Sequence, residues 1–164
     1  MSIIKTGMDT LDQLIEAWRT NNRINLFLID KISAAGMKCT LSTRGGRTVV
    51  RQFAHVHNNR VWQLEGRAKD LSKGLRKFST AEEPTKSALK KSLKESADRM
   101  EVFWRECLEG KPKRKSFKKG VITHLGYLIA HESHHRGSIL LTLKQCGHKL
   151  DNATAMAIWD WDRM

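Results

Sequence analysis

The 164-residue sequence predicts an all-α protein, an antiparallel four-helix bundle followed by a short C-terminal helix. Apolar residues recur at helical spacing in four long segments, and no segment keeps the strict alternation of a half-buried strand. Connectors of these lengths favour a bundle in which the apolar stripes are buried against one another. We expect a single domain over residues 1–164, because the chain has the length of one ordinary domain.

The first helix is expected over residues 8–34, and Gly36 is expected to end it in a left-handed conformation. Residues 36–47 then form a connector. The second helix is expected over residues 49–65, with Thr48 as its N-cap.

The third helix is expected over residues 85–109. Pro84 would lie in its first turn, because the fixed φ of proline suits the start of a helix. Gly110 and Pro112 are expected to end it.

The fourth helix is expected from residue 116 or 117 to about residue 146, with Gly147 ending it. Asp151 or Asn152 would cap the short C-terminal helix.

Basic residues outnumber acidic ones, with 30 Lys and Arg against 17 Asp and Glu and a formal net charge of +13. The excess is concentrated in residues 66–78, 86–94 and 110–120. Such a charge attracts polyanions, although solvated loops and an exposed helix face have the same composition.

The chain is expected in the cytoplasm. No apolar run approaches the roughly 18 residues needed to cross a membrane, and the N-terminus has no export signal. The three cysteines, Cys39, Cys107 and Cys146, are odd in number and widely spaced, which is typical of reduced thiols and not of a disulfide framework.

The segment AHESHHRG, residues 130–137, carries a candidate metal site. His131 and His135 are four residues apart, so on a helix they lie about 40° apart on one face. Two imidazoles with this spacing can converge on one divalent ion. The string also matches the protease pattern H-E-x-x-H formally, but nothing else in the sequence supports a protease.

A metal held by two side chains is weakly bound, so a third ligand is expected from another helix. The second helix offers His55 and His57, and amphipathicity alone slightly prefers His57. His134 is expected to point outward. His124 lies about 10 Å along the axis from His131, too far to share its ion.

The sequence is similar to the DinB/YfiT-like four-helix-bundle proteins over nearly its whole length. The matching stretches are residues 48–62, 124–151 and 158–161. The most specific feature is the H-x-x-x-H pair followed by Arg-Gly and an aliphatic run. The resemblance implies an up-down-down-up bundle.

The resemblance also implies a divalent metal ion, zinc or nickel, bound by His131, His135 and one histidine of the second helix. When residues 48–62 are compared with the second helix of the family one position at a time, that ligand falls on His55, with His57 as the alternative. Homodimers are common in the family, and characterised relatives include enzymes that use low-molecular-weight thiols in S-transfer or isomerisation. The high net charge is a departure from the family.

The first functional hypothesis is therefore a metalloenzyme, either a thiol-dependent S-transferase or a metal-dependent hydrolase of a small-molecule substrate. Neutral imidazoles leave the charge of the ion uncompensated, which lowers the pKa of a bound water or thiol. Glu132 is a candidate for a base or for a partner of a metal ligand, although its direction into the core also fits a structural pairing. Arg136 is a candidate for an anion-binding group or for a solvated surface residue. The alternative hypothesis is a basic nucleic-acid-binding or stress-response accessory protein with a structural or vestigial metal site.

Overall fold

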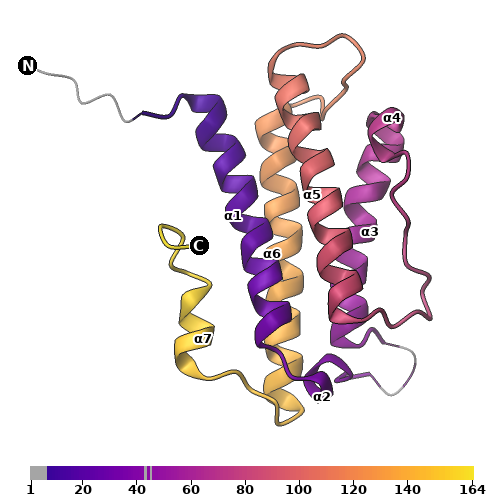
Figure 1. The fold of residues 1–164 in the computed structure, drawn as a ribbon, viewed down its shortest axis with the longest axis vertical. Coiled ribbons are helices and arrows are strands. Elements are labelled where there is room, and N and C mark those ends of the chain that lie inside the picture. Colours follow the sequence, from indigo (N-terminus) through magenta and orange to yellow (C-terminus); the bar gives the residue numbers. More distant parts are fainter. Residues whose placement is uncertain (1–6, 43, 45) are drawn as a thin grey trace, which may run out of the picture.

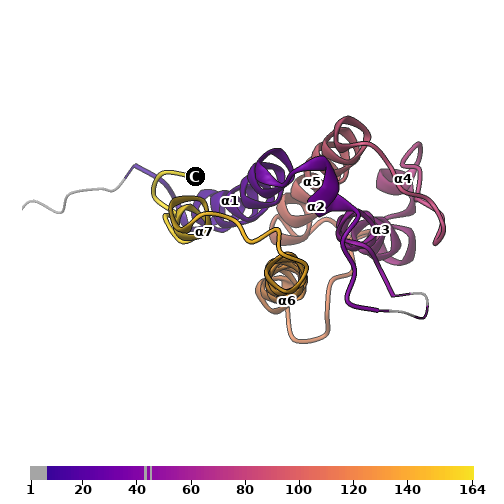
Figure 2. The same ribbon diagram turned by 90° about the horizontal axis from the view of Figure 1, so that it is seen from below.

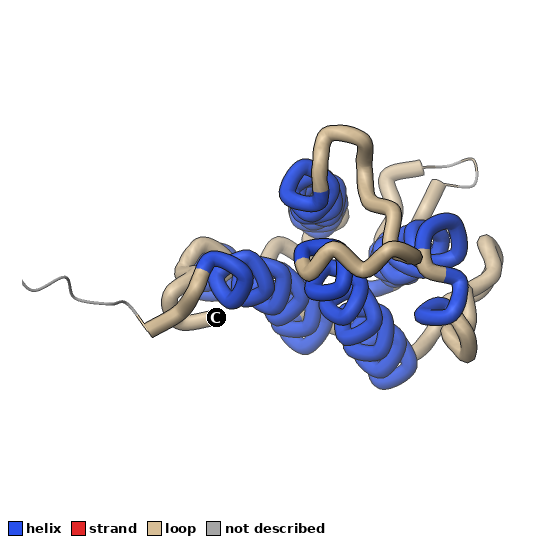
Figure 3. Tube along the Cα trace, turned by 90° about the horizontal axis from the view of Figure 1, so that it is seen from above, coloured by secondary structure: helices blue, strands red, loops and turns tan. Residues whose placement is uncertain are grey.

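The structure is a computed structural model that describes residues 7–42, 44 and 46–164. The N-terminal residues 1–6, and Thr43 and Gly45 of the predicted connector, lie outside the described residues. The described chain consists of helices and loops without a strand (Figure 3), so the all-α prediction is confirmed. The four long helices are α1 (Thr10–Lys31), α3 (Val49–Arg67), α5 (Lys86–Leu108) and α6 (Val121–Gln145).

The long helices pack side by side as a bundle (Figures 1 and 2). α1 and α3 each contact both α5 and α6. α1 and α6 run in one direction, whereas α3 and α5 run in the opposite one (Figure 1). The short helix α7 (Asn152–Ala157) lies beside α1. Across the part of the chain that the structure describes, no helix is both long and apolar enough to traverse a bilayer.

Several helix ends form as the sequence predicts. The side chain of Thr48 accepts a hydrogen bond from the backbone N–H of Arg51 and caps α3, and that of Asp151 caps α7. Gly110 follows α5 with φ of +74°, and Gly147 follows α6 with φ of +78°. Glycine adopts this left-handed conformation at little cost, so it ends a helix efficiently.

The predicted end of the first helix is wrong. α1 ends before Ile32, and the side chain of Ser33 caps a separate short helix, α2 (Ala34–Met37), which contains Gly36. A Cβ atom on Gly36 would lie 3.0 Å from side-chain atoms of Ile32 and Leu143. Glycine is therefore needed here for the close approach of α2 to α6 and not for a left-handed turn.

The place of Pro84 and the predicted start of the fourth helix are also wrong. α5 begins within one residue of its predicted start, but Thr85 is its N-cap, so Pro84 precedes the helix instead of lying in its first turn. α6 begins at Val121, and not at residue 116 or 117, because Gly120 has φ of +104° and cannot continue a right-handed helix. The basic loop after α3 contains a further short helix, α4 (Lys69–Ser72).

The interior of the bundle contains two hydrophobic clusters. One includes Leu28, Phe53, Leu93 and Ile139, and the other includes Trp18, Leu64, Phe103 and Leu128. Between them lies a set of buried polar residues from α1, α3 and α6, which we call the polar layer: Asn21, Asn22, Asn25, Arg60, Glu132 and Arg136.

Candidate metal centre

Three histidines from two helices converge on one side of the bundle. His55 comes from α3, and His131 and His135 come from consecutive turns of α6. One ring nitrogen of each lies within 4.8 Å of the others. The ring centroid of His55 is 5.5 Å from that of His131 and 4.8 Å from that of His135. We call these three residues the histidine cluster.

The antiparallel packing of α3 and α6 brings the cluster together. Contacts between the helices pair residues in reverse order: Gln63 lies 3.0 Å from His124, and Asn59 lies 3.3 Å from His131. One turn further along, His55 meets His135. His131 and His135, four residues apart on α6, thus both lie beside one residue of α3, His55.

His57, the alternative to His55, lies elsewhere. Its ring is buried. Its Nδ1 lies 3.1 Å from the hydroxyl of Ser96 on α5, and its Nε2 lies 2.9 Å from the carbonyl oxygen of Arg76. Both ring nitrogens therefore take part in contacts that join α3 to α5 and to the loop before it.

The other two histidines of α6 are also separate from the cluster. His134 is exposed, as predicted. His124 is buried, with one ring nitrogen 3.1 Å from the hydroxyl of Ser116 and the other 3.0 Å from the amide oxygen of Gln63. The ring of Phe117 stacks on it at a centroid distance of 4.0 Å. These contacts explain why residues 116 and 117 pack on α6 without belonging to it.

The stability of the fold is expected to fall in acid partly because of His124. Burial, aided by the charge of Arg67, lowers the pKa of His124 to about 4, whereas an unfolded histidine has a pKa of about 6.5. Between these values only the unfolded chain binds the proton, so this contribution to stability is complete above about pH 6.5 and is lost as the pH falls toward 4.

Urea unfolding at pH 7 and pH 5 would check this prediction. We expect His124→Gln, which keeps hydrogen-bonding capacity but does not titrate, to lose roughly 1 kcal/mol less stability than the wild type between these pH values. An equal loss in both proteins would contradict it.

The rings of the histidine cluster are neutral at neutral pH. Burial lowers the pKa of His55 to about 4, and the positive charge of Arg47 adds to the effect. Burial and the neighbouring imidazoles lower the pKa of His135 to about 4. Burial also lowers the pKa of His131, although the charge of Glu132 opposes it. Each ring therefore keeps a free lone pair, which a metal ligand requires.

The cluster fits a divalent metal ion. Histidine nitrogens lie about 2.0–2.1 Å from a bound zinc ion, so two of them on one ion are at most about 4.2 Å apart. The separation of up to 4.8 Å in the cluster is larger than the roughly 3.4 Å of tetrahedral zinc ligands, so the rings must turn toward one another to hold one ion. Three imidazoles leave further coordination positions for small molecules.

Glu132 follows His131 in sequence but belongs to the polar layer. Its carboxylate accepts two hydrogen bonds from Arg60, at 2.7 and 2.8 Å, and one each from Asn21 and Asn25, both at 2.7 Å. Burial raises the pKa of Glu132, but the charge and hydrogen bonds of Arg60 outweigh it and hold the pKa below its ordinary value. The ionised carboxylate thus faces the core, where the charge of Arg60 neutralises it.

Arg136 follows His135 and also belongs to the polar layer. Its guanidinium donates to the side-chain oxygens of Asn25 and Ser133, at 2.9 and 2.7 Å. Burial lowers its pKa to about 10, so it remains charged at neutral pH. Glu132 and Arg136 fix the rotation of α6 from inside the bundle, which aims His131 and His135 at α3.

Comparison with known proteins identifies the family of the chain. The sequence profile of the DinB family matches residues 8–162, which is nearly the whole chain. The chain belongs to the DinB family. No curated protein and no solved structure gives a significant match. Membership of the DinB family and the histidine cluster are each compatible with a metal site.

Four residues around the cluster of this DinB-family chain were not singled out by sequence reasoning. Asn59 contacts Nδ1 of His131, and the ring centroids of Trp62 and Tyr127 lie 5.9 Å from His55 and 6.2 Å from His131, respectively. The fourth residue is Arg47, whose positive charge adds to burial in lowering the pKa values of the three cluster histidines. The available signal was helical spacing, because Asn59 follows His55 by four residues and Tyr127 precedes His131 by four.

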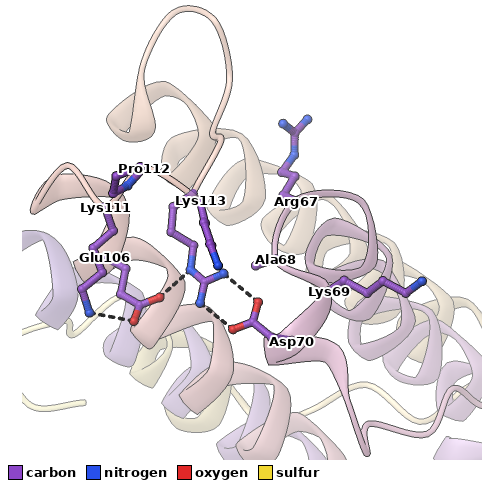
Figure 4. Close-up of a pocket in the computed structure, with 9 residues that line it drawn as sticks. Arg67, Ala68, Lys69, Asp70, Glu106, Lys111, Pro112 and Lys113 are labelled. Atoms are coloured by element: carbon purple, nitrogen blue, oxygen red, sulfur yellow. Dashed lines mark hydrogen bonds and ion pairs between the residues drawn. The ribbon is translucent and has the colours of Figure 1, made fainter.

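The basic segment 110–120 of this DinB-family chain lies at a different cavity, of about 560 Å³, near the end of α3 (Figure 4). Arg114 donates to Asp70 at 2.7 Å and to Glu106 at 2.5 Å, and Lys111 donates to Glu106 at 2.9 Å. Part of the positive charge predicted to attract polyanions is therefore paired within the protein.

Proposed function

We propose that this DinB-family protein is a metalloenzyme that binds one divalent ion, zinc or nickel, through His55, His131 and His135. The observation that supports the proposal is the convergence of three half-buried imidazoles within 4.8 Å. Imidazole ligation suits both metals. The lowered pKa values keep the ligands free of protons at neutral pH.

The proposed reaction is thiol-dependent S-transfer to a small molecule, with hydrolysis as the variant in which water replaces the thiol. A divalent ion held by neutral imidazoles supplies positive charge that lowers the pKa of a bound thiol or water. The protein contributes the fixed orientation of its ligands, since Asn59 contacts His131 and such contacts hold a ligating ring in place. The exposed side chains of Trp62 and Tyr127 flank the site.

The metal content of protein purified without a histidine tag tests the first part of the proposal. We expect close to one divalent ion per chain in the wild type and none in the variant with His55, His131 and His135 all changed to Ala. His134→Ala is the matched control, because it removes an exposed histidine of the same helix. Equal metal content in the wild type and the triple variant would contradict the proposal.

Turnover tests the second part. Cysteine with an aryl halide, and p-nitrophenyl acetate with water, represent the two reactions, and we expect one of them to depend on metal and to be lost in the triple variant. Binding of a polyanion that falls steeply with salt and survives His131→Ala would instead support the nucleic-acid alternative. The homodimer remains a prediction, which light scattering would check.

A further inference from the structure

A cavity of about 560 Å³ lies directly beside the histidine cluster. It is formed by α3 between Arg51 and Trp62, by the connector before α3 and by the loop before α5. Its lining includes one cluster residue, and the lining residues that matter here are Arg47, Arg51, His55, Trp62, Lys77 and Phe78. A molecule in this cavity therefore contacts the cluster through His55.

The cavity is positively charged. Its charged lining residues are Arg47, Arg51 and Lys77, and no carboxylate is among the described residues that line it. The ammonium group of Lys77 donates hydrogen bonds of 2.6 and 2.7 Å to the carboxylate of Glu65, which neutralises its charge. Arg51 donates one N–H to the carbonyl oxygen of Thr80, but its buried Nε has no hydrogen-bond partner within the described chain. The two arginines thus leave positive charge at the cavity that no carboxylate of the described lining balances.

Arg47 lines the same cavity as His55. The arginine is exposed, so an incoming ligand can reach it. An anion at Arg47 would therefore share the cavity with one of the three proposed metal ligands.

Part of the cavity wall is apolar, because Ala54, Trp62 and Phe78 belong to its lining. Trp62 is 46 % exposed, which leaves a flat aromatic surface for a ligand. The backbone of Phe78, another lining residue, is held by the side chain of Asn58 through hydrogen bonds of 2.8 and 2.9 Å. The loop before α5 is thereby fixed to α3.

We propose that this cavity is the substrate pocket and that it takes an anionic small molecule, whose carboxylate or phosphate group is bound by Arg47 and Arg51. The apolar body of the molecule packs on Trp62, and its reactive end lies at the histidine cluster. Guanidinium groups match the geometry of both anions. This inference rests on the function proposed above, because it assigns the substrate class of the same site.

Titration of metal-free protein with three small probes tests the inference. Benzoate and benzamide have nearly the same shape and differ in charge, and phenyl phosphate presents the other anion. Binding is followed through the indole N–H signal of Trp62 in NMR spectra, assigned with Trp62→Phe. We expect benzoate or phenyl phosphate to bind at least about tenfold more tightly than benzamide, as charge-assisted hydrogen bonds require. The tighter anion identifies the group that the pocket prefers.

Variants of the arginines locate the binding. Arg47→Gln and Arg51→Gln are each expected to weaken binding of the preferred anion about tenfold. Arg44→Gln makes the same change at an exposed arginine of the same connector that does not line the cavity, and it should leave affinity unchanged. Absence of binding, equal affinity for benzoate, phenyl phosphate and benzamide, or unchanged affinity in both lining variants would overturn the inference.

The two proposals fail separately. Anion binding is measured without metal, so a protein that binds the anions but never a metal ion would contradict the proposed function alone. A protein that binds one metal ion and does not distinguish the anions from benzamide would contradict the substrate class alone.

Discussion

Replacement of Arg60 by Met is expected to lower the free energy of unfolding by about 3–5 kcal/mol, because it leaves the ionised carboxylate of Glu132 buried without its partner. Arg60 is completely buried. Besides its two bonds to Glu132, it donates to the side chain of Asn22 at 2.8 Å and to the carbonyl oxygen of Leu93 at 2.9 Å. Denaturant unfolding of the wild type and the variant measures the effect.

Lys90→Met is the matched control. Lys90 pairs with Asp30 at 2.7 Å, but the two side chains are 30 % and 55 % exposed, and exposed ion pairs contribute less than about 1 kcal/mol. A second control combines Arg60→Met with Glu132→Gln, which removes the uncompensated charge, and this double variant should lose less stability than the sum of the single changes. Similar losses for Arg60→Met and Lys90→Met would show that burial of the pair is unimportant.

The second large effect is expected on metal affinity. His55→Ala should weaken zinc binding by a factor of about 100 or more, since it removes a ligand, and even partners of ligands commonly contribute 10- to 100-fold. His57→Ala should leave zinc affinity nearly unchanged and instead lower stability, because His57 joins α3 to Ser96 and to the carbonyl of Arg76. Competition with a chromophoric chelator measures affinity, and thermal unfolding measures stability.

The two variants form a sharp comparison, because they remove the same side chain two residues apart on one helix. A protein in which His57→Ala abolishes zinc binding while His55→Ala retains it would reverse our assignment of the ligand on α3. Circular dichroism would establish that each variant is folded before its affinity is interpreted.

The bundle itself could be predicted because its signals are local. Apolar spacing identified all four long helices, and Thr48, Asp151, Gly110 and Gly147 act at the ends where their chemistry placed them. The start of α6 could not be predicted, because Phe117 resembles a core residue of the helix. It instead stacks on His124 from the preceding loop, a contact that exists only in the folded protein.

The candidate site could be predicted in part. The spacing of His131 and His135 placed both on one face of a helix, but amphipathicity favoured His57 over His55. His57 does face the core, where it has its own hydrogen-bonding partners, whereas His55 lies at the edge of the bundle with its ring beside those of the α6 pair. Orientation toward the core therefore pointed to the histidine that lies away from the α6 pair, whereas the family resemblance pointed to His55, whose ring lies beside that pair.

The polar layer has a consequence for how the helices align along their axes. Apolar stripes tolerate sliding, whereas a shift of α6 by one turn, about 5.4 Å, would carry Glu132 away from Arg60 and into a hydrophobic cluster. Every misaligned arrangement then contains an unmatched buried charge, which is costly. We expect the chain to select one alignment by this means, so that His55 meets His131 and His135 before any metal ion is present.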